Sequence, residues 1–543
     1  MYLKKATLLG LLAGLALLVL VACGGGSRSS STQGGAAAAR PARVEPKTIS
    51  VAISETPATM DFHYFGNTGN GNIKAMIMEG LLGYDENPDR SVTHYPLLAE
   101  SYESSPDGKV WTFKLRKGIK FHNGEDFNSD ACMVTYQRII DDPTLNTSAV
   151  WRTGLEKVEA PDDYTFIMYM NEPSVIMRTS LESTPIFAPK AWREHGTDYI
   201  FNLMLYGTGP WILTEYVDGQ FARFKKNENY WGDFRSYYDE VIIRFVGEES
   251  TGVASMLAGD LRVYGRSGGL NRNSVSQFRG RDDIVMMEYE TTTMLYFGMQ
   301  CRQGHLFSDR RAREAFSLAI DRQAILNSIL TGGIPNTTTW AVPGSNAYDP
   351  NLPLLEYNPE KAKQLLKETG YNGAPMMLTS STQSTMASEV VLALAEMLND
   401  VGFNFNTRIL ESAPFLEMRL SSNYDVFMVN GMPSVGGDCG DIFTQRLHND
   451  LHASNFVSEQ GNEMIRASNR EFDVAKRLEL MKEINRHYRD HFGPVINLVY
   501  FKLSNPYYKG VVGFRFTGSG GFDFTTISWE PDAPFYMGRK NPK

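Results

Sequence analysis

A turn, a β-hairpin and a second turn follow one another within residues 206–232, and this unit constrains the fold more than any other stretch. Two strand-like runs, 211–217 and 220–226, are separated by Asp218-Gly219, a dipeptide that tolerates the positive φ angles of a two-residue hairpin turn. The sequence therefore predicts a hairpin at this point of the chain.

Small residues precede the hairpin and aromatic residues follow it. The Gly-Thr-Gly-Pro run at 207–210 is nearly without side chains, so its backbone can lie close to a neighbouring lobe or a ligand. The run at 227–232 reads N-E-N-Y-W-G and ends the unit with Tyr230 and Trp231. The local chemistry alone also fits a surface hairpin closed by an aromatic plug.

Together these features resemble the signature of the family 5 extracellular solute-binding proteins of ABC transporters. Further runs resemble that family: P-L-L-A-E-S-Y at 96–102, S-P-D-G-K-V-W-T-F-K-L-R-K-G-I-K-F-H-N-G at 105–124 and S-D-R-R-A-R-E-A-F-S-L-A-I-D-R at 308–322. The resemblance covers nearly all of residues 48–529. It implies an α/β, periplasmic-binding-protein-like (type II) fold, which is a two-lobe hinged clamp with an extra inserted domain.

At 543 residues the chain is too long for a single hydrophobic core. The resemblance predicts a lobe 1 made of 47–82, 206–297 and 505–543, an inserted domain at 83–205, and a lobe 2 at 298–504. Hydrophobic periodicity predicts strands at 48–53, 110–115, 164–170, 241–246, 293–299, 405–409 and 426–429, and helices at 73–82, 133–140, 308–322, 388–401 and 473–487. In the run at 105–124, Trp111, Phe113 and His122 are expected in the core rather than at a ligand.

The amino terminus has the pattern of a secretory signal. Lys4 and Lys5 precede an apolar run at 6–22 that is short for a membrane span. The run ends in L-V-A-C, which resembles a bacterial lipobox and implies cleavage before Cys23 and a lipid anchor on its thiol; an unmodified cysteine is the alternative. Residues 24–46 are rich in Gly, Ser and Ala and predict a flexible linker. We therefore expect an exported protein, lipid-anchored and facing the periplasm or the cell exterior.

Composition and motifs exclude several other functions. A net charge of −9 provides no basic field for nucleic acid. The sequence has no G-x-S-x-G, H-E-x-x-H, Walker or dinucleotide-binding motif, so a secreted lipoprotein hydrolase is only an alternative, and we expect no cofactor. Cys132, Cys301 and Cys439 lack metal-site spacing and are expected to be buried thiols, although one long-range disulfide remains open.

The resemblance implies reversible capture of a solute and its delivery to an ABC permease by a monomeric receptor. Peptides dominate the family's cargo, while oligosaccharides, opines, metal complexes and other neutral polar solutes are alternatives. The position that pairs with a peptide's amine in relatives falls on Val435, or on Asp438 if the loop shifts. The segment that carries a carboxylate-binding arginine in dipeptide binders, 379–385, has no cation here.

Burying an unpaired charge costs several kcal/mol, so we expect a cargo that lacks one or both terminal charges. The candidate ligand-binding residues are Asn67, Thr68, Trp151, Trp340, Thr382, Gln383, Met432, Pro433, Val435, Asp438 and Tyr500.

Overall fold

The computed structural model divides the chain into two units, 1–45 and 46–543, and the fold belongs to the second. The predicted signal peptide, Cys23 and most of the predicted linker lie outside the residues that the structure describes. These are 45–57, 59–63, 68–86, 92–142, 145, 154–196, 205–330, 333–335, 340–343, 345–382, 386–431, 438–447, 454–516 and 521–531.

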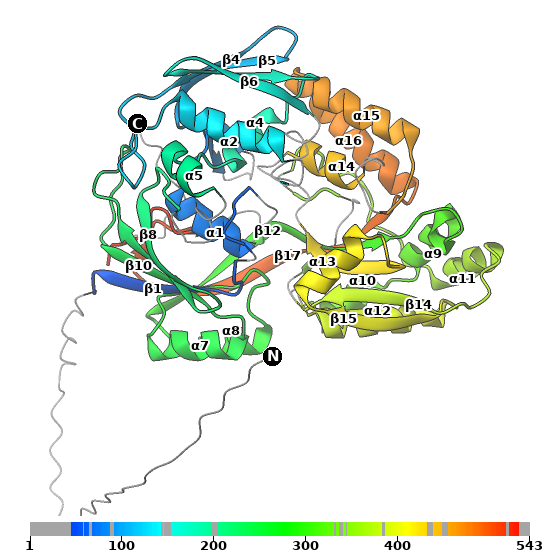
Figure 1. The fold of residues 1–543 in the computed structure, drawn as a ribbon. Coiled ribbons are helices and arrows are strands. Elements are labelled where there is room, and N and C mark those ends of the chain that lie inside the picture. Colours follow the sequence, from blue (N-terminus) through cyan, green and yellow to red (C-terminus); the bar gives the residue numbers. More distant parts are fainter. Residues whose placement is uncertain are drawn as a thin grey trace, which may run out of the picture. The chain divides into compact units, whose positions relative to one another are not determined.

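An eleven-stranded sheet runs through the body (Figure 1). Its strand order is β15-β14-β16-β12-β17-β11-β1-β10-β9-β8, with β13 paired to β17 beside this path. The strands are β1 (Thr48–Ile53), β8 (Trp211–Val217), β9 (Phe221–Lys226), β10 (Glu240–Phe245), β11 (Val263–Gly265), β12 (Ile284–Met299), β13 (Gly333–Pro335), β14 (Met376–Ser381), β15 (Phe405–Leu410), β16 (Val426–Gly431) and β17 (Val495–Tyr508). The predicted hairpin is confirmed as β8 and β9, with Gly219 at φ 69°.

The long strands β12 and β17 belong to both halves of this sheet. Their register runs from Ile284↔Tyr508 to Glu290↔Lys502, breaks, and resumes at Met294↔Tyr500. On one side of the break β17 pairs with β11, and on the other side β12 pairs with β16. The sequence predicted only 293–299 of β12 and did not predict β17.

We call the half of the sheet with β1 and β8–β11 lobe 1, and the half with β14–β16 lobe 2. Lobe 1 carries α1 (Thr68–Ile77), α7 (Glu249–Ala258) and α8 (Arg272–Ser276). Lobe 2 carries α9 (Arg310–Leu318), α10 (Arg322–Ser328), α11 (Pro359–Glu368), α12 (Ala387–Asp400), α13 (Ser412–Leu420), α14 (Gly440–Arg446), α15 (Glu459–Arg470) and α16 (Val474–Asp490), with a 3-10 turn at Leu306–Ser308. Short strand pairs β18 (Val511–Val512) with β21 (Ser528–Trp529), and β19 (Arg515–Phe516) with β20 (Phe522–Asp523), end the described chain.

The segment between β1–α1 and β8 forms a separate sheet with its own helices, which we call the insert. Its strands β4 (Ala99–Ser104), β5 (Val110–Leu115), β7 (Thr165–Met170) and β6 (Leu155–Asp162) pair in that order, and β2 (Leu82–Glu86) pairs with β3 (Val92–Pro96). Its helices are α2 (Ser129–Asp141), α4 (Met177–Ser183) and α5 (Pro189–His195). Asn128 caps α2 by accepting from the amide of Asp130.

The hydrophobic cores are distributed unevenly among these parts. One core combines buried residues of lobe 1 and the insert, among them Ile49, Phe113 and Trp211. Lobe 2 has two cores, one around Phe316 and Leu378 and the other around Trp340 and Met481. None of the described cores combines buried residues of the insert with buried residues of lobe 2. The insert is therefore part of the same packed body as lobe 1.

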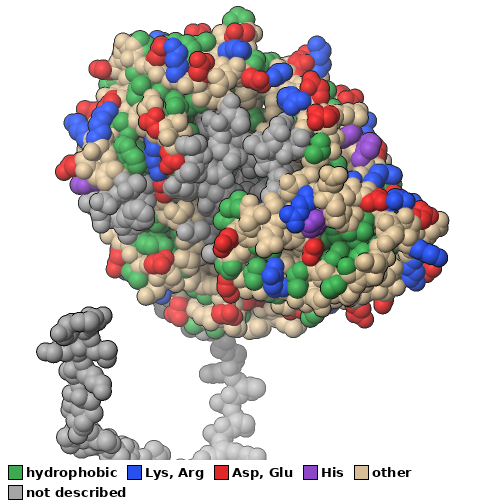
Figure 2. Space-filling model, turned by 45° about the vertical axis from the view of Figure 1, so that its right-hand side comes forward, with side chains coloured by type: hydrophobic (Ala, Val, Ile, Leu, Met, Phe, Trp, Pro, Cys, Tyr) green, Lys and Arg blue, Asp and Glu red, His purple; other side chains and the backbone are tan. Residues whose placement is uncertain are grey.

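Several expectations about burial are confirmed. Trp111 and Phe113 are buried, and Cys132, Cys301 and Cys439 are buried free thiols rather than a disulfide. On the face shown in Figure 2, acidic and basic side chains are interspersed. Among the described helices, none is long and apolar enough to cross a membrane.

Candidate functional site

The carboxyl ends of the parallel strands in both lobes lie beside the register break of β12 and β17. In lobe 1, β1 is parallel to β10 and β11; in lobe 2, β14 is parallel to β15 and β16. The last residue of β16, Gly431, pairs with Met294 at the break. Asn505 of β17 bonds the main chain of Arg266, directly after β11. Ligands of α/β proteins bind at carboxyl ends of strands, where the topology switches direction, so this region is the candidate binding site.

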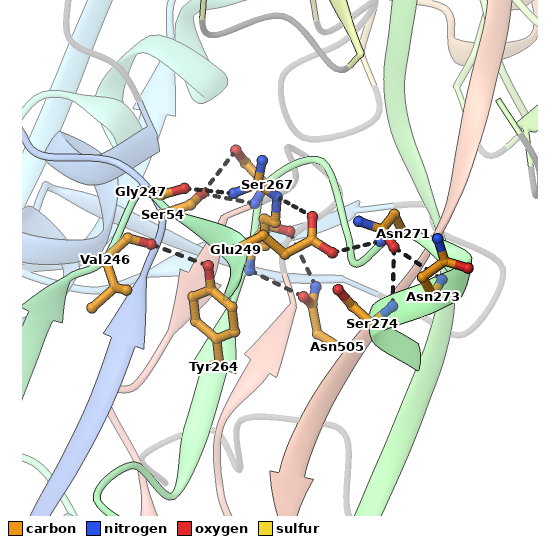
Figure 3. A network of polar contacts seen from close by, with 11 residues as sticks. Ser54, Val246, Gly247, Glu249, Tyr264, Ser267, Asn271, Asn273, Ser274 and Asn505 are labelled. Carbon is orange, nitrogen blue, oxygen red and sulfur yellow. Dashed lines mark hydrogen bonds and ion pairs between the residues drawn. The ribbon is translucent and has the colours of Figure 1, made fainter. Parts of the chain in front are cut away.

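On the lobe 1 side, the ends of β1 and β11 are joined by hydroxyl groups (Figure 3). The amide of Ser267 donates to Oγ of Ser54 at 3.2 Å, and Oγ of Ser267 donates to Oε1 of Glu55 at 2.6 Å. The side-chain amide of Asn505 accepts from the Arg266 amide and donates to the Arg266 carbonyl, both at 3.1 Å. These bonds fix the backbone after both strands against the strand that crosses to lobe 2.

The charges in this network compensate one another. Arg266 approaches Glu249 at 3.3 Å and donates to the carbonyl of Gly247 at 2.7 Å. The other oxygen of Glu249 accepts from the amide of Asn271, whose side chain in turn caps α8 (Figure 3). Tyr264 donates to the carbonyl of Val246 at 3.1 Å. The network therefore presents polar groups rather than an unpaired cation to a ligand.

On the lobe 2 side, the end of β14 carries the run T-S-S-T. Ser380 donates to the carbonyl of Met428 at 2.9 Å, which joins β14 to β16. Thr382 is exposed, and its hydroxyl donates to Oε2 of Glu411 at 3.0 Å. Tyr500 is buried and lies in β17 opposite Met294 and Ile334. Of these residues, Thr382 is the one whose side chain is open to solvent.

Asp438 is held by an internal ion pair. Its carboxylate accepts two hydrogen bonds from the guanidinium of Arg477 on α16, one of them at 2.8 Å, and a third from the amide of Gly440 at 2.7 Å. Burial by itself would raise the pKa of Asp438, but Arg477 and the Gly440 amide hold this pKa below its usual value. An incoming amine would therefore compete with an arginine that already neutralises the carboxylate.

Trp340 has the position of a core residue. Only 1% of it is exposed, and its ring meets Tyr296 edge-on with centroids 4.5 Å apart. Its Nε1 is buried without a hydrogen-bond partner in the described chain. In this structure the ring is thus part of the lobe 2 core rather than of an exposed wall.

The remaining predicted site residues lie at the edge of the described chain or outside it. Thr68 is the first residue of α1, which begins five residues before the predicted helix at 73–82 and ends at Ile77. The residues outside the described part of the chain are Asn67, Trp151, Gln383, Met432, Pro433 and Val435. Within the described part there is no group of three side chains that could hold a metal ion.

Sequence reasoning missed Glu79, which organises the hairpin unit. Its carboxylate accepts from the hydroxyls of Thr208 at 2.8 Å and Tyr230 at 2.7 Å, and from the indole of Trp231 at 2.8 Å. Glu79 lies just before the chain enters the insert, and Thr208 lies just after it returns. An isolated glutamate after a helix carries no sequence signal for this role, although its three donors were all in the recognised motif.

The Gly-rich turn in that motif contacts a neighbouring backbone, as predicted. A Cβ at Gly207 would lie 1.8 Å from the carbonyl oxygen of Ile77, and the amide of Gly209 donates to the same oxygen at 3.1 Å. His122 of the insert donates to the carbonyl of Gly209 at 2.9 Å. The turn is therefore where α1, the hairpin and the insert meet.

A second buried cluster joins lobe 1 to the insert. Arg138 of α2 donates to both carboxylate oxygens of Asp61 and to Nδ1 of His63. Nε2 of His63 donates to the carbonyl of Pro185 at 3.0 Å, and its ring stacks on Phe187. Desolvation and Arg138 lower the pKa of His63 to about 4, so this histidine is neutral and has a structural role.

The chain is similar to a known family and to characterised proteins. The model of the family described as bacterial extracellular solute-binding proteins, family 5 Middle, matches residues 93–448. The glutathione-binding protein GsiB of Escherichia coli O1:K1 / APEC is 28% identical over 374 residues, covering 67% of this chain and 70% of that protein.

Two solved structures share the fold. DppA of Helicobacter pylori, in complex with the peptide STSA, has a TM-score of 0.77 and 19% identity over 89% of this chain and 98% of that chain. AgaA of A. tumefacien R10, in complex with agropinic acid, has a TM-score of 0.76 and 23% identity over 89% and 99%. The predicted periplasmic-binding-protein fold is therefore confirmed.

Proposed function

Because the chain belongs to the bacterial extracellular solute-binding proteins, family 5, we propose that its lobes close around a peptide-like solute and deliver it to a membrane permease. The chain is the substrate-binding component of an ABC importer and not an enzyme. Proteins of this class act by domain closure around hinge segments that absorb the change in backbone angles.

The observation that carries this proposal is the register break shared by β12 and β17. Two strands cross between the lobes, and both change register within Glu290–Met294 and Lys502–Tyr500. A β-bulge bends its strand and weakens the ladder locally. The carboxyl ends of both parallel strand sets lie beside it, so bending there would open and close the candidate site around a ligand.

The described charges support a cargo that lacks one or both terminal charges. Asp438 is neutralised by Arg477, and Arg266 is neutralised by Glu249. The end of β14 offers hydroxyls rather than a cation. A longer peptide, a blocked peptide or a neutral polar solute would leave no buried charge unpaired, whereas a free zwitterionic dipeptide would leave two.

Calorimetry with the full-length protein tests the cargo. We expect N-acetylated, C-amidated tripeptides and tetrapeptides to bind more tightly than the zwitterionic dipeptides of the same sequences. Submicromolar binding of a zwitterionic dipeptide that is lost in Asp438→Asn would contradict this proposal, because it would show that Asp438 is an amine anchor. The relatives' cargoes, glutathione and agropinic acid, belong in the same screen as candidates for a non-peptide or modified-peptide ligand.

We also propose that Cys23 carries the lipid that anchors the receptor. The L-V-A-C sequence after an apolar run, followed by a linker without apolar periodicity, supports this assignment. Metabolic labelling with a fatty acid should label the wild-type protein and not Cys23→Ala. Equal labelling of the two proteins would contradict the assignment.

A further inference from the structure

A small set of contacts joins the insert to lobe 2 on a side of the molecule other than the hinge strands. The amide of Val175, between β7 and α4, donates to the carbonyl of Asn469 on α15 at 3.0 Å. Next to it, Arg470 of α15 donates to Glu172 at 2.5 Å. In Figure 1, α15 and α16 lie beside the four-stranded sheet of the insert.

Two apolar contacts between described residues belong to the same junction. A Cβ at Gly108, in the turn between β4 and β5, would lie 2.4 Å from Cζ of Phe472 and 3.3 Å from Cβ of Pro173. A Cβ at Gly440 would lie 2.8 Å from Cγ2 of Ile176. The Phe472 ring thus lies against the insert's turn, and Ile176 lies against the start of α14.

These contacts are individually weak. Arg470 and Glu172 are 43% and 61% exposed, so their ion pair is well screened by solvent. Phe472 is itself 44% exposed, and no described core combines buried residues of the insert and lobe 2. A junction of this kind can separate and re-form without unfolding either side, because little apolar surface has to enter water.

The junction is also connected to the loop that the sequence assigned to the ligand. Asp438, a predicted ligand residue in that loop, is bound through its carboxylate by Arg477. The same guanidinium lies 2.6 Å from a Cβ built at Gly440, and it donates to the carbonyl of Ser468 on α15. Asp438 and Arg477 therefore fix the end of the predicted ligand loop to the helices that meet the insert.

We propose that these contacts are a closure latch, formed by Glu172, Val175 and Ile176 of the insert with Asn469, Arg470 and Phe472 of lobe 2. This inference rests on the proposed closing of the lobes around a solute. The latch residues do not touch the ligand; they set the population of the closed form. Since only the closed form encloses a ligand, the apparent affinity falls by the same factor as the population of that form.

Hydrogen exchange measured by mass spectrometry on the full-length protein tests the latch without a ligand. The Val175 amide is bonded only across the junction, so its exchange rate reports the opening equilibrium. We expect Phe472→Ala to accelerate its exchange by roughly tenfold, since half-buried aromatic surface is lost. The matched control Leu420→Ala removes a 73% exposed apolar side chain on α13 of the same lobe and should leave Val175 unchanged. Equal exchange in the wild-type protein and Phe472→Ala would overturn the proposal.

Two probes separate the latch from the choice of cargo. Glutathione and the peptide Ser-Thr-Ser-Ala are added to the same samples, and binding is followed by calorimetry. A probe that binds should slow the exchange of the Val175 amide in the wild-type protein. It should also bind more weakly to Phe472→Ala. A bound probe that leaves the exchange rate of Val175 unchanged would overturn the coupling between ligand binding and the latch. If neither probe binds, glutathione and this free tetrapeptide are excluded as cargo, while accelerated exchange in Phe472→Ala still supports the latch.

Discussion

The insert contacts lobe 1 and lobe 2 in two different ways. Against lobe 1 it shares a hydrophobic core, and buried groups such as Arg138, Asp61 and His63 bond across the boundary. Between the described residues of the insert and lobe 2 there are a backbone hydrogen bond, an exposed ion pair and apolar contacts at Gly108 and Gly440. We therefore expect the first junction to resist separation and the second to open more readily. In the proposed closure, lobe 1 and the insert therefore move together as one body against lobe 2.

The largest effect on the free energy of unfolding is expected for a substitution where the chain enters and leaves the insert. Gly207→Ala would place a Cβ 1.8 Å from the carbonyl oxygen of Ile77, and neither group is a side chain that could rotate away. We expect a loss of about 4 kcal/mol in the free energy of unfolding. The matched control is Gly71→Ala in α1, where a Cβ meets nothing within 4 Å and alanine favours the helix. Urea unfolding of both variants measures the difference. Equal stability of the two variants would contradict the close packing of the insert against lobe 1.

The next largest effect on stability is expected from removing the Glu79 carboxylate. This group joins the segment before the insert to the segment after it. Glu79→Ala leaves the donors of Thr208, Tyr230 and Trp231 without their acceptor, and we expect a loss of about 3 kcal/mol. The control Glu228→Ala lies in the same motif with a side chain that is 76% exposed, and its effect should stay within about 0.5 kcal/mol. Thermal unfolding of the two variants tests this; similar melting temperatures would contradict the role of Glu79.

Acid should weaken the junction with lobe 1. Burial lowers the pKa of both His63 and His122 from 6.5 to about 4, although hydrogen bonds to the Pro185 and Gly209 carbonyls oppose this. Arg138 further lowers the pKa of His63, and Lys74 does so slightly, whereas Asp61 raises it. Since the unfolded chain binds protons more readily, the stabilisation from neutral histidine is complete above pH 6.5. It is lost as the pH falls from 6.5 to 4.

This loss in the free energy of unfolding is up to about 3 kcal/mol for each histidine. Urea unfolding at several pH values between 7.5 and 4.5 should show a steep decrease in stability for the wild-type protein. His63→Asn and His122→Asn should be less stable at pH 7.5 but show a shallower decrease. A slope that neither substitution changes would contradict the assignment to these side chains.

The smallest effect is expected at the latch. Arg470→Ala removes an exposed ion pair worth less than about 1 kcal/mol, so global stability should not change measurably. The exchange rate of the Val175 amide should increase less than about fivefold. Arg466→Ala is the matched control on the same helix, where Arg466 pairs with Glu463. If the two substitutions changed the exchange rate of the Val175 amide equally, the Arg470–Glu172 ion pair would have no specific role in closure.

Local sequence signals predicted individual elements well. Alternation predicted β5 and the Asp-Gly dipeptide predicted the β8–β9 hairpin, because both depend on neighbouring residues. The resemblance gave the fold class. By contrast, the crossing of β12 and β17 between lobes has no local signature, since a strand passing from one core to another shows no change in period. The predicted domain boundaries stay a prediction.

The site residues were harder to predict from the sequence, because their contacts also depend on residues that are distant along the chain. Glu79 and the His63–Arg138 pair act through partners that are distant in the sequence, 77 residues apart in the case of Arg138 and Asp61. Asp438 was considered as an amine anchor, but only the fold reveals that Arg477 binds it. The other loop residues, including Val435 and Trp151, lie outside the described chain. Their assignment to the ligand therefore stays a prediction.

Three backbone amides of the insert test the central claim most directly. The amides of Ile186 and His122 donate to Glu79 and Gly207 in lobe 1, while the amide of Val175 donates to Asn469 in lobe 2. Hydrogen exchange of the ligand-free, full-length protein should show Val175 exchanging through a local opening at least about a hundredfold faster than the other two, which should exchange only through unfolding of the shared core. Equal protection of all three amides would contradict the account, because the insert would then be joined to both lobes alike.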